Sequence, residues 1–312
     1  MILDRAIARL LPAVPKPIVH RLSQPYIAGS RLEDACRVVK RLNGAGKMAT
    51  IDVLGEEITH EDEARAIAKA YRDVFETIER QQLDSNVSVK LTALGLKLDY
   101  ELCRENLESV VREAAGRSNF VRIDMEDSST TSDTLSLYRG LRESGLDNVG
   151  VVLQAYLRRT VDDIRDLADL RPNVRLCKGI YLEPPDLAYQ DYEEVRANYV
   201  HALELLLDGG CYVGIATHDE WLLAEGRRLV AEHGLRREEY EFQMLLGVRS
   251  ELGDELVRQG HRLRIYVPFG EHWYGYSLRR LQENPKIAGY VAADTLGRLL
   301  PVPLPWRNGS SA

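Results

Sequence analysis

The pair Arg279–Arg280, near the C-terminal end of the 312-residue chain, has the chemistry of a carboxylate grip. A guanidinium makes two parallel charge-assisted hydrogen bonds to a planar carboxylate. Adjacent residues project about 100° apart on a helix, so both arginines reach one ligand only at a helix end facing the site. Tyr276 lies one turn before the pair, and Glu283 follows it closely. On residue type alone, a solvated basic face with a local Arg–Glu pair is the more common interpretation.

Polar side chains also stand at or near the ends of most short β-rich runs. These are Lys90, Asp124, Gln154, Arg175, Lys178, Thr217, His218, Gln243 and Tyr266. One such residue is usually a capping or solvated group. A ring of them has another meaning if the runs are the strands of a barrel, because the carboxyl ends of barrel strands carry the active site.

Eight β-rich runs recur at the spacing of strand–helix units. They are Ala49–Leu54, Asn86–Thr92, Phe120–Met125, Val149–Ala155, Val174–Lys178, Tyr212–Thr217, Glu241–Leu246 and Leu263–Val267. Several are rich in Val and Ile, as parallel strands covered on both faces should be. A doubly wound sheet would use fewer strands and a switch point. The pattern predicts a (βα)8 TIM-type barrel with extra N-terminal helices.

The segments between these runs have helical periodicity. Residues 61–82 place apolar side chains at i, i+3, i+4 and i+7, with Thr59 as the expected N-cap. Residues 32–46 and 192–210 are expected helices that end at glycines. We expect a helical segment over 1–48 that packs on the barrel, the barrel over 49–306 and a disordered tail over 307–312.

Composition narrows the class of protein. The formal net charge of −7 argues against a nucleic-acid partner, which would need a clustered basic surface. The four cysteines lie far apart without a CxxC pair, which is typical of reduced thiols in a cytoplasmic protein. The start of the chain is too short and too charged for a signal peptide, and no apolar run could span a bilayer. A capping helix closed by Pro12, Pro15 and Pro17 is expected there, with a membrane-surface anchor as the alternative.

The motifs of the chain argue against two other kinds of site. Asp124 and His218 could ligate a metal, but no HxH or HExxH spacing is present and we expect no metal. No GxGxxG follows a strand, so a Rossmann-type site is not expected. A barrel can still bind a nucleotide cofactor through basic residues and loop amides at its carboxyl end.

Six segments, taken together and in order, resemble the proline dehydrogenase family. They are IDVLGE, VRLCKGIY, IATHD, EFQMLLG, RIYVPFG and YSLRRLQEN, and the resemblance extends from Ala49 to Asn284. It implies a (βα)8 barrel with non-covalent FAD that oxidises L-proline to Δ1-pyrroline-5-carboxylate, the first step of proline catabolism. The electrons would pass to a membrane quinone, and a peripheral contact with the inner face of the membrane is compatible with that role. A separate pyrroline-5-carboxylate dehydrogenase is a candidate partner, because this chain has no such domain.

The resemblance also assigns residues to the substrate. It implies that Arg279 and Arg280 bind the proline carboxylate and that Lys90 and Asp124 lie at the proline site. The walls around the ring would be Tyr181, Leu245, Tyr266 and Tyr276. Family members that prefer 4-hydroxyproline have a smaller residue in place of Tyr266, so proline is the expected substrate. Glu56 and Arg175 match a pair that closes over the substrate and excludes water.

For FAD, the resemblance implies a longer set of contacts. It comprises Asp124, Met125, Gln154, Arg175, Cys177, Lys178, Gly179, Ile180, Thr217, His218, Gln243, Arg280 and Glu283. Cys177 and Ile180 depart from the family pattern, which has valine and alanine there. The departures leave the assignment in place but put the packing around the flavin in doubt. Two alternatives remain open: a flavin-free hydrolase or aldolase with Lys90 or Lys178 as a Schiff-base lysine, and a non-catalytic binding barrel.

Overall fold

The computed structural model describes residues 16–55 and 58–283, with the side chains of all of these except Ile18 and residues 279–283. The described residues fall into two compact units. One contains helices α2 (Lys16–Ser23) and α11 (Trp273–Glu283), and the other contains Tyr26–His272.

Eight parallel strands of the larger unit close into a barrel in sequence order, with β1 also paired to β8. The strands are β1 Met48–Val53, β2 Ser85–Val89, β3 Val121–Ile123, β4 Val149–Gln154, β5 Asn173–Cys177, β6 Tyr212–Ala216, β7 Tyr240–Leu245 and β8 Leu263–Phe269. The (βα)8 fold predicted from the sequence is therefore confirmed, and each predicted run contains one strand or overlaps it closely.

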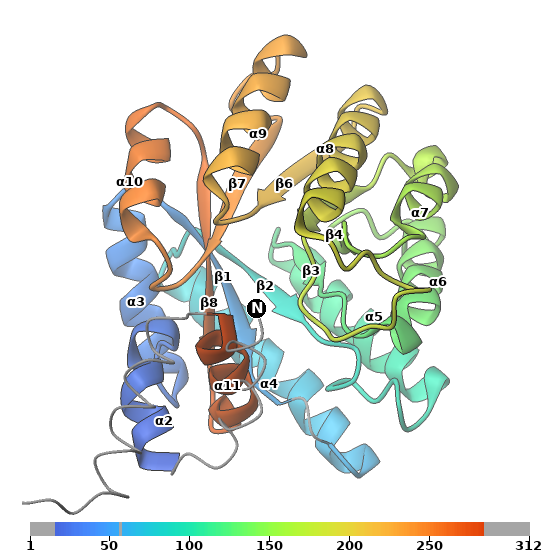
Figure 1. Ribbon diagram of the computed structural model, residues 1–312. Helices are drawn as coiled ribbons and strands as arrows, with labels where there is room; N and C mark the ends of the chain where they lie inside the picture. The colour runs from blue at the N-terminus through green and yellow to red at the C-terminus, as the bar shows by residue number, and fades with distance from the viewer. Residues whose placement is uncertain (1–15, 56–57, 284–312) are drawn as a thin grey trace, which may run out of the picture. The chain divides into compact units, whose positions relative to one another are not determined.

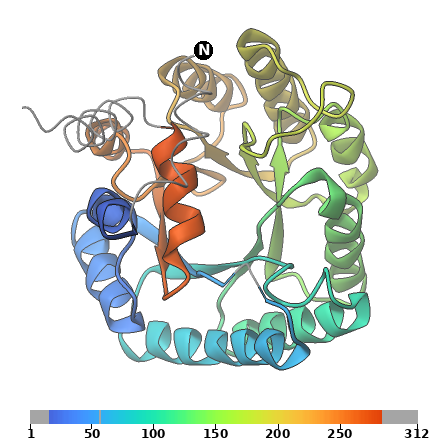
Figure 2. The same cartoon turned by 60° about the horizontal axis from the view of Figure 1, so that its bottom comes forward.

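Helices follow the strands and surround them, as Figures 1 and 2 show for this unit. They are α3 Leu32–Gly44, α4 Glu61–Arg80, α5 Tyr100–Gly116, α6 Thr131–Glu143, α7 Thr160–Asp166, α8 Tyr192–Asp208, α9 Glu220–Glu232 and α10 Ser250–Arg258. Short 3-10 turns lie at η2 Gln24–Tyr26, η3 Ser128–Thr130 and η4 Ala168–Leu170. Helices α3, α4 and α8 match the three predicted from periodicity.

The start of α4 differs by one residue from the prediction. His60 is the N-cap, and the Glu63 carboxylate accepts hydrogen bonds from the backbone N–H groups of Thr59 and His60. The prediction of Thr59 as the N-cap is therefore wrong. The Glu63 carboxylate, at the third position of the helix, binds the backbone N–H groups of both Thr59 and His60, as in a capping box. The three acidic residues in the first turn suit the positive end of the helix dipole.

Apolar side chains form one core between the strands and the helices. Alternate strand residues such as Ile51, Val87 and Ile123 are fully buried in it, with Tyr71 and Phe75 from α4. The other strand residues face the inside of the barrel, where many are charged or amide-bearing. Barrels of this class usually fill that space with Val, Ile and Leu. Here polar groups fill it, so hydrogen bonds hold the interior.

Two glycines make room for these interior side chains. A Cβ at Gly150 would lie 2.5 Å from Nη1 of Arg122, and a Cβ at Gly214 would lie 2.4 Å from Nε2 of Gln243. Both distances are shorter than any normal contact. Each glycine on a strand therefore marks a close approach of a long polar side chain.

The smaller unit contains the helix that was predicted to carry the arginine pair. In it, the rings of His20 on α2 and Trp273 on α11 meet edge to face at 4.8 Å. Pro17 lies in the first turn of α2, so it belongs to the start of this helix. Pro12 and Pro15 lie outside the described residues. No helix in the described ranges is long and apolar enough to cross a membrane.

Candidate active site

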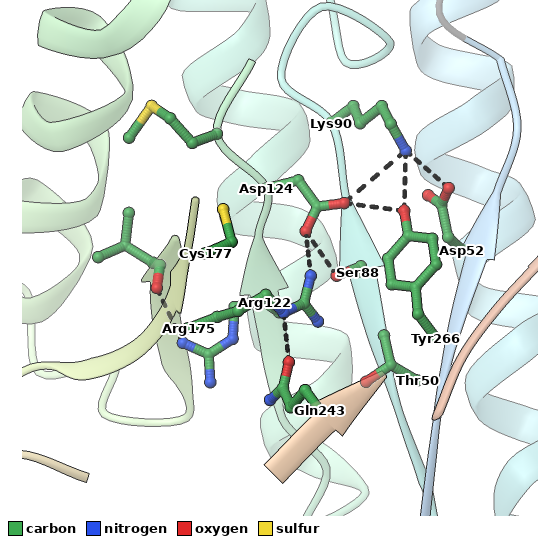
Figure 3. Close-up of polar contacts among 12 residues, drawn as sticks. Thr50, Asp52, Ser88, Lys90, Arg122, Asp124, Arg175, Cys177, Gln243 and Tyr266 are labelled. Carbon is green, nitrogen blue, oxygen red and sulfur yellow. Dashed lines mark hydrogen bonds and ion pairs between the residues drawn. The ribbon is translucent and has the colours of Figure 1, made fainter. Parts of the chain in front are cut away.

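Charged and polar side chains meet at the carboxyl end of the barrel (Figure 3). Lys90 follows β2, and its Nζ lies 2.6 Å from Oδ2 of Asp52 on β1. The same ammonium donates to the Tyr266 hydroxyl on β8 at 3.1 Å and lies 3.7 Å from Oδ2 of Asp124. Three oxygens around three N–H donors are what a protonated lysine requires.

Asp124, just after β3, is the centre of a second set of hydrogen bonds. Its Oδ1 accepts from the Ser88 hydroxyl at 2.8 Å and from Nη1 of Arg175 at 2.6 Å, while Oδ2 accepts from the Tyr266 hydroxyl at 2.9 Å. The Arg175 guanidinium lies 5.3 Å from the centre of the Tyr266 ring. The tyrosine is thus fixed by its hydroxyl and by a cation beside its ring.

The network continues from Arg175 toward the other end of the barrel. Nε of Arg175 donates to Gln243 at 2.5 Å, and Gln243 donates to Glu241 at 2.6 Å. Glu241 accepts from Nε and Nη2 of Arg264 at 2.8 and 3.1 Å and from the Tyr212 hydroxyl at 2.9 Å. All but Tyr212 are buried, so a continuous hydrogen-bonded chain crosses the barrel interior.

Burial opposes the charge of both acids of this network, but the net shifts of their pKa values have opposite signs. Burial raises the pKa of Asp52, because the attraction of Lys90 only partly offsets the loss of water. Its Oδ1 has no hydrogen-bond partner among the described residues. Burial also opposes the charge of Glu241, but Arg264 and its other donors overcome it and lower the pKa to about 2. Glu241 is therefore ionised, as the partner of Arg264.

A second charged cluster lies beside β5 and β6, around Asp219. Its carboxylate accepts two hydrogen bonds from Arg196 at 2.8 and 3.0 Å, one from Tyr192, and one from Lys178 at 3.4 Å. Burial opposes its ionisation, yet Arg196, Tyr192 and Lys178 hold its pKa far below the usual range. Asp219 also caps α9 by accepting from the Trp221 N–H. This carboxylate anchors Lys178 at the rim.

The remaining residues predicted for a cofactor lie around the same end of the barrel. Gln154 ends β4 and its amide donates to the carbonyl of Met125 at 3.4 Å, while its buried Oε1 has no partner among the described residues. Nε2 of His218 accepts from the Leu245 N–H at 2.9 Å. Thr217 follows β6 and is buried. All of these come from strand ends or from the residues just after them.

The β5 loop holds the other predicted contacts. Cys177 is the last residue of β5, and Gly179 has a φ of +105°. A Cβ at Gly179 would lie 2.0 Å from the Tyr156 ring, so no other residue fits there. Ile180 and Tyr181 are partly buried in the same loop. The isoleucine that departs from the family pattern thus lies in the loop after β5.

Some predicted residues are not brought into this cluster by the described structure. Glu56 lies outside the described residues, so the expected pairing with Arg175 stays a prediction; Arg175 binds Asp124 and Gln243. Tyr276 lies on α11 in the smaller unit. The side chains of Arg279, Arg280 and Glu283, on the same helix, lie outside what the structure describes. Their roles stay predictions.

Five residues of the network were not singled out from the sequence, namely Asp52, Ser88, Tyr212, Glu241 and Arg264. Asp52 holds Lys90, Ser88 binds Asp124, and Glu241 pairs with Arg264. Asp52 had a signal, because an acid stands inside the apolar run Ala49–Leu54. Glu241 is the first residue of the predicted run Glu241–Leu246, and nothing in that run indicated that its side chain is buried. Ser88 carried no signal.

The geometry weighs against Lys90 as a Schiff-base lysine. A Schiff-base lysine reacts as a neutral amine, whereas Nζ of Lys90 lies 2.6 and 3.7 Å from the carboxylate oxygens of Asp52 and Asp124, which favour its charged form. Nε2 of His218 accepts a hydrogen bond from the Leu245 N–H, so its lone pair is in use. In residues 16–55 and 58–283, no three His, Cys, Asp or Glu side chains are grouped as a metal site would need.

Comparison with known proteins identifies the family. The family model described as proline dehydrogenase matches residues 35–293, most of the chain. The chain belongs to the proline dehydrogenase family. Proline dehydrogenase 1 of Bacillus subtilis (strain 168) is 41% identical over 271 residues, which cover 87% of this chain and 89% of that protein. Proline dehydrogenase of Deinococcus radiodurans is 36% identical over 279 residues, covering 88% and 90%.

A solved structure shares the barrel of this proline dehydrogenase family member. It is proline utilization A (PutA) from Bdellovibrio bacteriovorus, inactivated by N-propargylglycine, with a TM-score of 0.81 and 25% identity. The match covers 91% of this chain and 36% of that chain, so this protein spans about a third of that PutA. The common part is the eight-stranded barrel.

Proposed function

We propose that this protein oxidises L-proline to Δ1-pyrroline-5-carboxylate with FAD as its cofactor. The observation that carries the proposal is the cluster of Lys90, Asp124, Arg175 and Tyr266 at the carboxyl end of the barrel, in a chain of this family. These residues come from four strands that only a closed barrel brings together. A binding barrel without chemistry would have no need of two buried cations balanced against two acids at this end.

The chemistry of the residues around the cluster fits a flavin. The buried Oε1 of Gln154 lacks a donor among the described residues, and a flavin ring offers N–H donors. Lys178 and Arg175 supply positive charge on the same side. FAD, when bound, supplies the hydride acceptor for proline oxidation.

We assign the FAD contacts to residues of the barrel rim and of α11. They are Asp124, Met125, Gln154, Arg175, Cys177, Lys178, Gly179, Ile180, Thr217, His218, Gln243, Arg280 and Glu283. Asp219 contributes indirectly, since it fixes the position of the Lys178 ammonium.

The Lys90–Tyr266–Asp124 triangle has the role of holding one wall of the proline pocket. Because the Tyr266 hydroxyl both accepts from Lys90 and donates to Asp124, the ring cannot move aside without breaking two hydrogen bonds. A substrate with a 4-hydroxyl would crowd this fixed ring, so proline is the better fit. Tyr181, Leu245 and Tyr276 complete the walls in this proposal.

Orientation of the substrate falls to the arginine pair. Arg279 and Arg280 bind the proline carboxylate and so fix the ring with its reacting C–H in one direction. Glu56, joined to Arg175, closes over the substrate and excludes water. Apolar walls favour the neutral amine, which gives up a hydride far more readily than the protonated form.

Beyond the oxidation step, we propose a quinone of the membrane as the electron acceptor. The protein would then act in the cytoplasm with a peripheral contact at the inner face of the membrane, and a separate pyrroline-5-carboxylate dehydrogenase would receive the product.

The visible spectrum of the purified protein tests the proposal. Flavin absorption bands that bleach under anaerobic conditions on adding L-proline support it, and D-proline serves as the matched control. A colourless protein that remains inactive after incubation with FAD would refute it.

A further inference from the structure

A cavity of about 510 Å³ lies at the amino-terminal end of the barrel strands, opposite the candidate active site. Its inner part is formed by strand residues that include Arg122, Asn173, Glu241 and Arg264. Helix α4, which contributes Phe75, and the loops after α4 and α5 form its outer part. A volume of several hundred Å³ is that of a small-molecule site.

The floor of this cavity is built from a polar layer of the barrel. Arg122 on β3 is 2% exposed, and its guanidinium lies 5.0 Å from the Phe120 ring. Nη1 donates to the carbonyls of Asn173 and Val151 at 2.6 and 3.0 Å, and Nη2 donates to Oδ1 of Asn173. Arg122 is therefore held by neutral oxygens on one side and by an aromatic ring.

The charge of Arg122 has no counter-charge at contact distance. No carboxylate of the described residues lies within ion-pair distance of its guanidinium, and its buried Nε has no hydrogen-bond partner among them. Arg264 has Glu241, and Arg117 has Glu79 and Glu113. A buried charge without a partner costs folding free energy.

The lining as a whole is also positive. It contains four arginines, of which Arg262 at the rim likewise has no carboxylate partner among the described residues, and three acids. The lining therefore has more positive than negative side chains, whereas the whole chain has a net charge of −7. Burial, with repulsion from Arg175 and Arg264, lowers the pKa of Arg122 to about 9, so it remains a cation at neutral pH.

Two asparagine side chains add neutral donors to the lining. Oδ1 of Asn173 faces Arg122, which is donor-only, so the amide nitrogen of Asn173 must point elsewhere. Oδ1 of Asn86 accepts from Thr50. Neither amide nitrogen has a hydrogen-bond partner among the described residues. Cations and N–H donors together are the chemistry that recognises an oxyanion.

We propose that this cavity binds a small organic anion with a carboxylate or phosphate head, which supplies the missing charge beside Arg122 and Asn173. The aromatic and aliphatic side chains of the outer part contact the body of the ligand. The site is separate from proline oxidation, since its residues lie at the opposite end of the barrel.

Titration calorimetry of the FAD-loaded protein tests this, with succinate and inorganic phosphate as the two probes at constant ionic strength. We expect one of them to bind at about one per chain with a dissociation constant of about 1 mM or lower. Tighter succinate binding would assign the site to carboxylates, and tighter phosphate binding to phosphate esters. If neither probe binds, the proposal is wrong.

An isosteric substitution locates the site. Asn173→Asp places a carboxylate where Oδ1 already accepts from Arg122, so the chain supplies its own counter-charge and the anion should bind at least about tenfold more weakly. Gln259→Glu is the matched control: Gln259 also accepts from an arginine, Arg227, but on the surface away from the cavity. It should bind the probe like the wild type.

Two further variants separate this cavity from other sites. Arg262→Gln removes a cation at the rim and should weaken binding of the probe severalfold. This variant tests the site even if Asn173→Asp does not fold. Arg280→Met should retain the binding. A loss of binding in Arg280→Met with full binding in Asn173→Asp and Arg262→Gln would place the anion elsewhere and overturn the proposal.

Discussion

Replacing Glu241 by glutamine removes one charge from the barrel interior and keeps the volume of the side chain. Glu241 is 2% exposed and accepts two hydrogen bonds from Arg264, with others from Tyr212 and Gln243. A glutamine keeps one acceptor oxygen but leaves the guanidinium of Arg264, itself 8% exposed, without a counter-charge. We expect Glu241→Gln to be strongly destabilising.

Two estimates of the loss in unfolding free energy agree. The pKa of Glu241 falls from 4.5 to about 2, and at about 1.4 kcal/mol per pKa unit the folded state favours its ionised form by about 3 kcal/mol. Breaking a buried ion pair by removing one partner costs about 3–5 kcal/mol. For a chain of this size, the loss would lower the melting temperature by roughly 6–20 °C.

The dependence on pH has a definite sign. Because the pKa of Glu241 is lower in the folded state, its contribution is complete above the ordinary value of 4.5 and is lost as the pH falls toward 2. The difference in unfolding free energy between wild type and Glu241→Gln should therefore be about 2 kcal/mol smaller at pH 3 than at pH 7.

Urea denaturation followed by circular dichroism, at both pH values, measures this difference. Glu239→Gln is the control, because that residue pairs with Arg236 on the surface and its loss should change the midpoint little. Adding Arg264→Met to Glu241→Gln should restore part of the stability, since it removes the stranded cation. The reasoning is refuted if Glu241→Gln unfolds at the midpoint of Glu239→Gln.

Four further changes test other parts of the molecule. Tyr266→Phe should lower kcat/KM for proline about 10- to 100-fold, because it removes hydrogen bonds to Lys90 and Asp124. Tyr240→Phe, at the amino-terminal end of β7, should leave kcat/KM unchanged, and equal values for both variants would contradict the assigned wall. Arg280→Met should weaken proline binding at least about tenfold, and far more than FAD binding, as measured by flavin difference spectra. Replacing the exposed Arg258 by methionine is the control and should change neither affinity. Equal losses of proline and FAD binding would mean that the arginine pair is structural. The rate of anaerobic flavin reduction by proline should rise with pH as the amine loses its proton, and a flat profile would count against the neutral-amine mechanism. Gly150→Ala should lower the unfolding free energy by about 1–3 kcal/mol, since its Cβ would meet Arg122 and the Asn173 carbonyl. Gly140→Ala is the control and should not lower it, because no atom lies within 4 Å of that Cβ. A Gly150→Ala variant as stable as the wild type would show that Arg122 can move aside.

The strands were predictable from the sequence because their outward-facing residues are Val, Ile and Leu in short runs between turns. The strand boundaries were less predictable. The third run was predicted as Phe120–Met125, yet β3 is only Val121–Ile123. The backbone N–H of Asp124 still donates to the Val89 carbonyl, and its carboxylate binds Arg175 and Tyr266.

The site was predictable in its residue types and only partly in its contacts. Lys90, Asp124 and Tyr266 were found as polar residues at strand ends, and they meet. The partner of Lys90 was not found, since Asp52 lies 38 residues earlier and only the register of β1 and β2 brings the two together. The pairing of Glu241 with Arg264 likewise depends on β7 lying beside β8. Contacts across a barrel depend on closure, which no local pattern contains.

The charged interior has a consequence for the response of the protein to heat. Water solvates ions less favourably as temperature rises, so the cost of keeping Arg264, Glu241, Arg175 and Asp124 out of water decreases on heating. The apolar side chains between the helices and the strands do not become cheaper to bury on heating in this way. Warming should therefore loosen the helices from the outside while the ion-paired centre of the barrel persists, and amide exchange in β7 and β8 should be the last to accelerate.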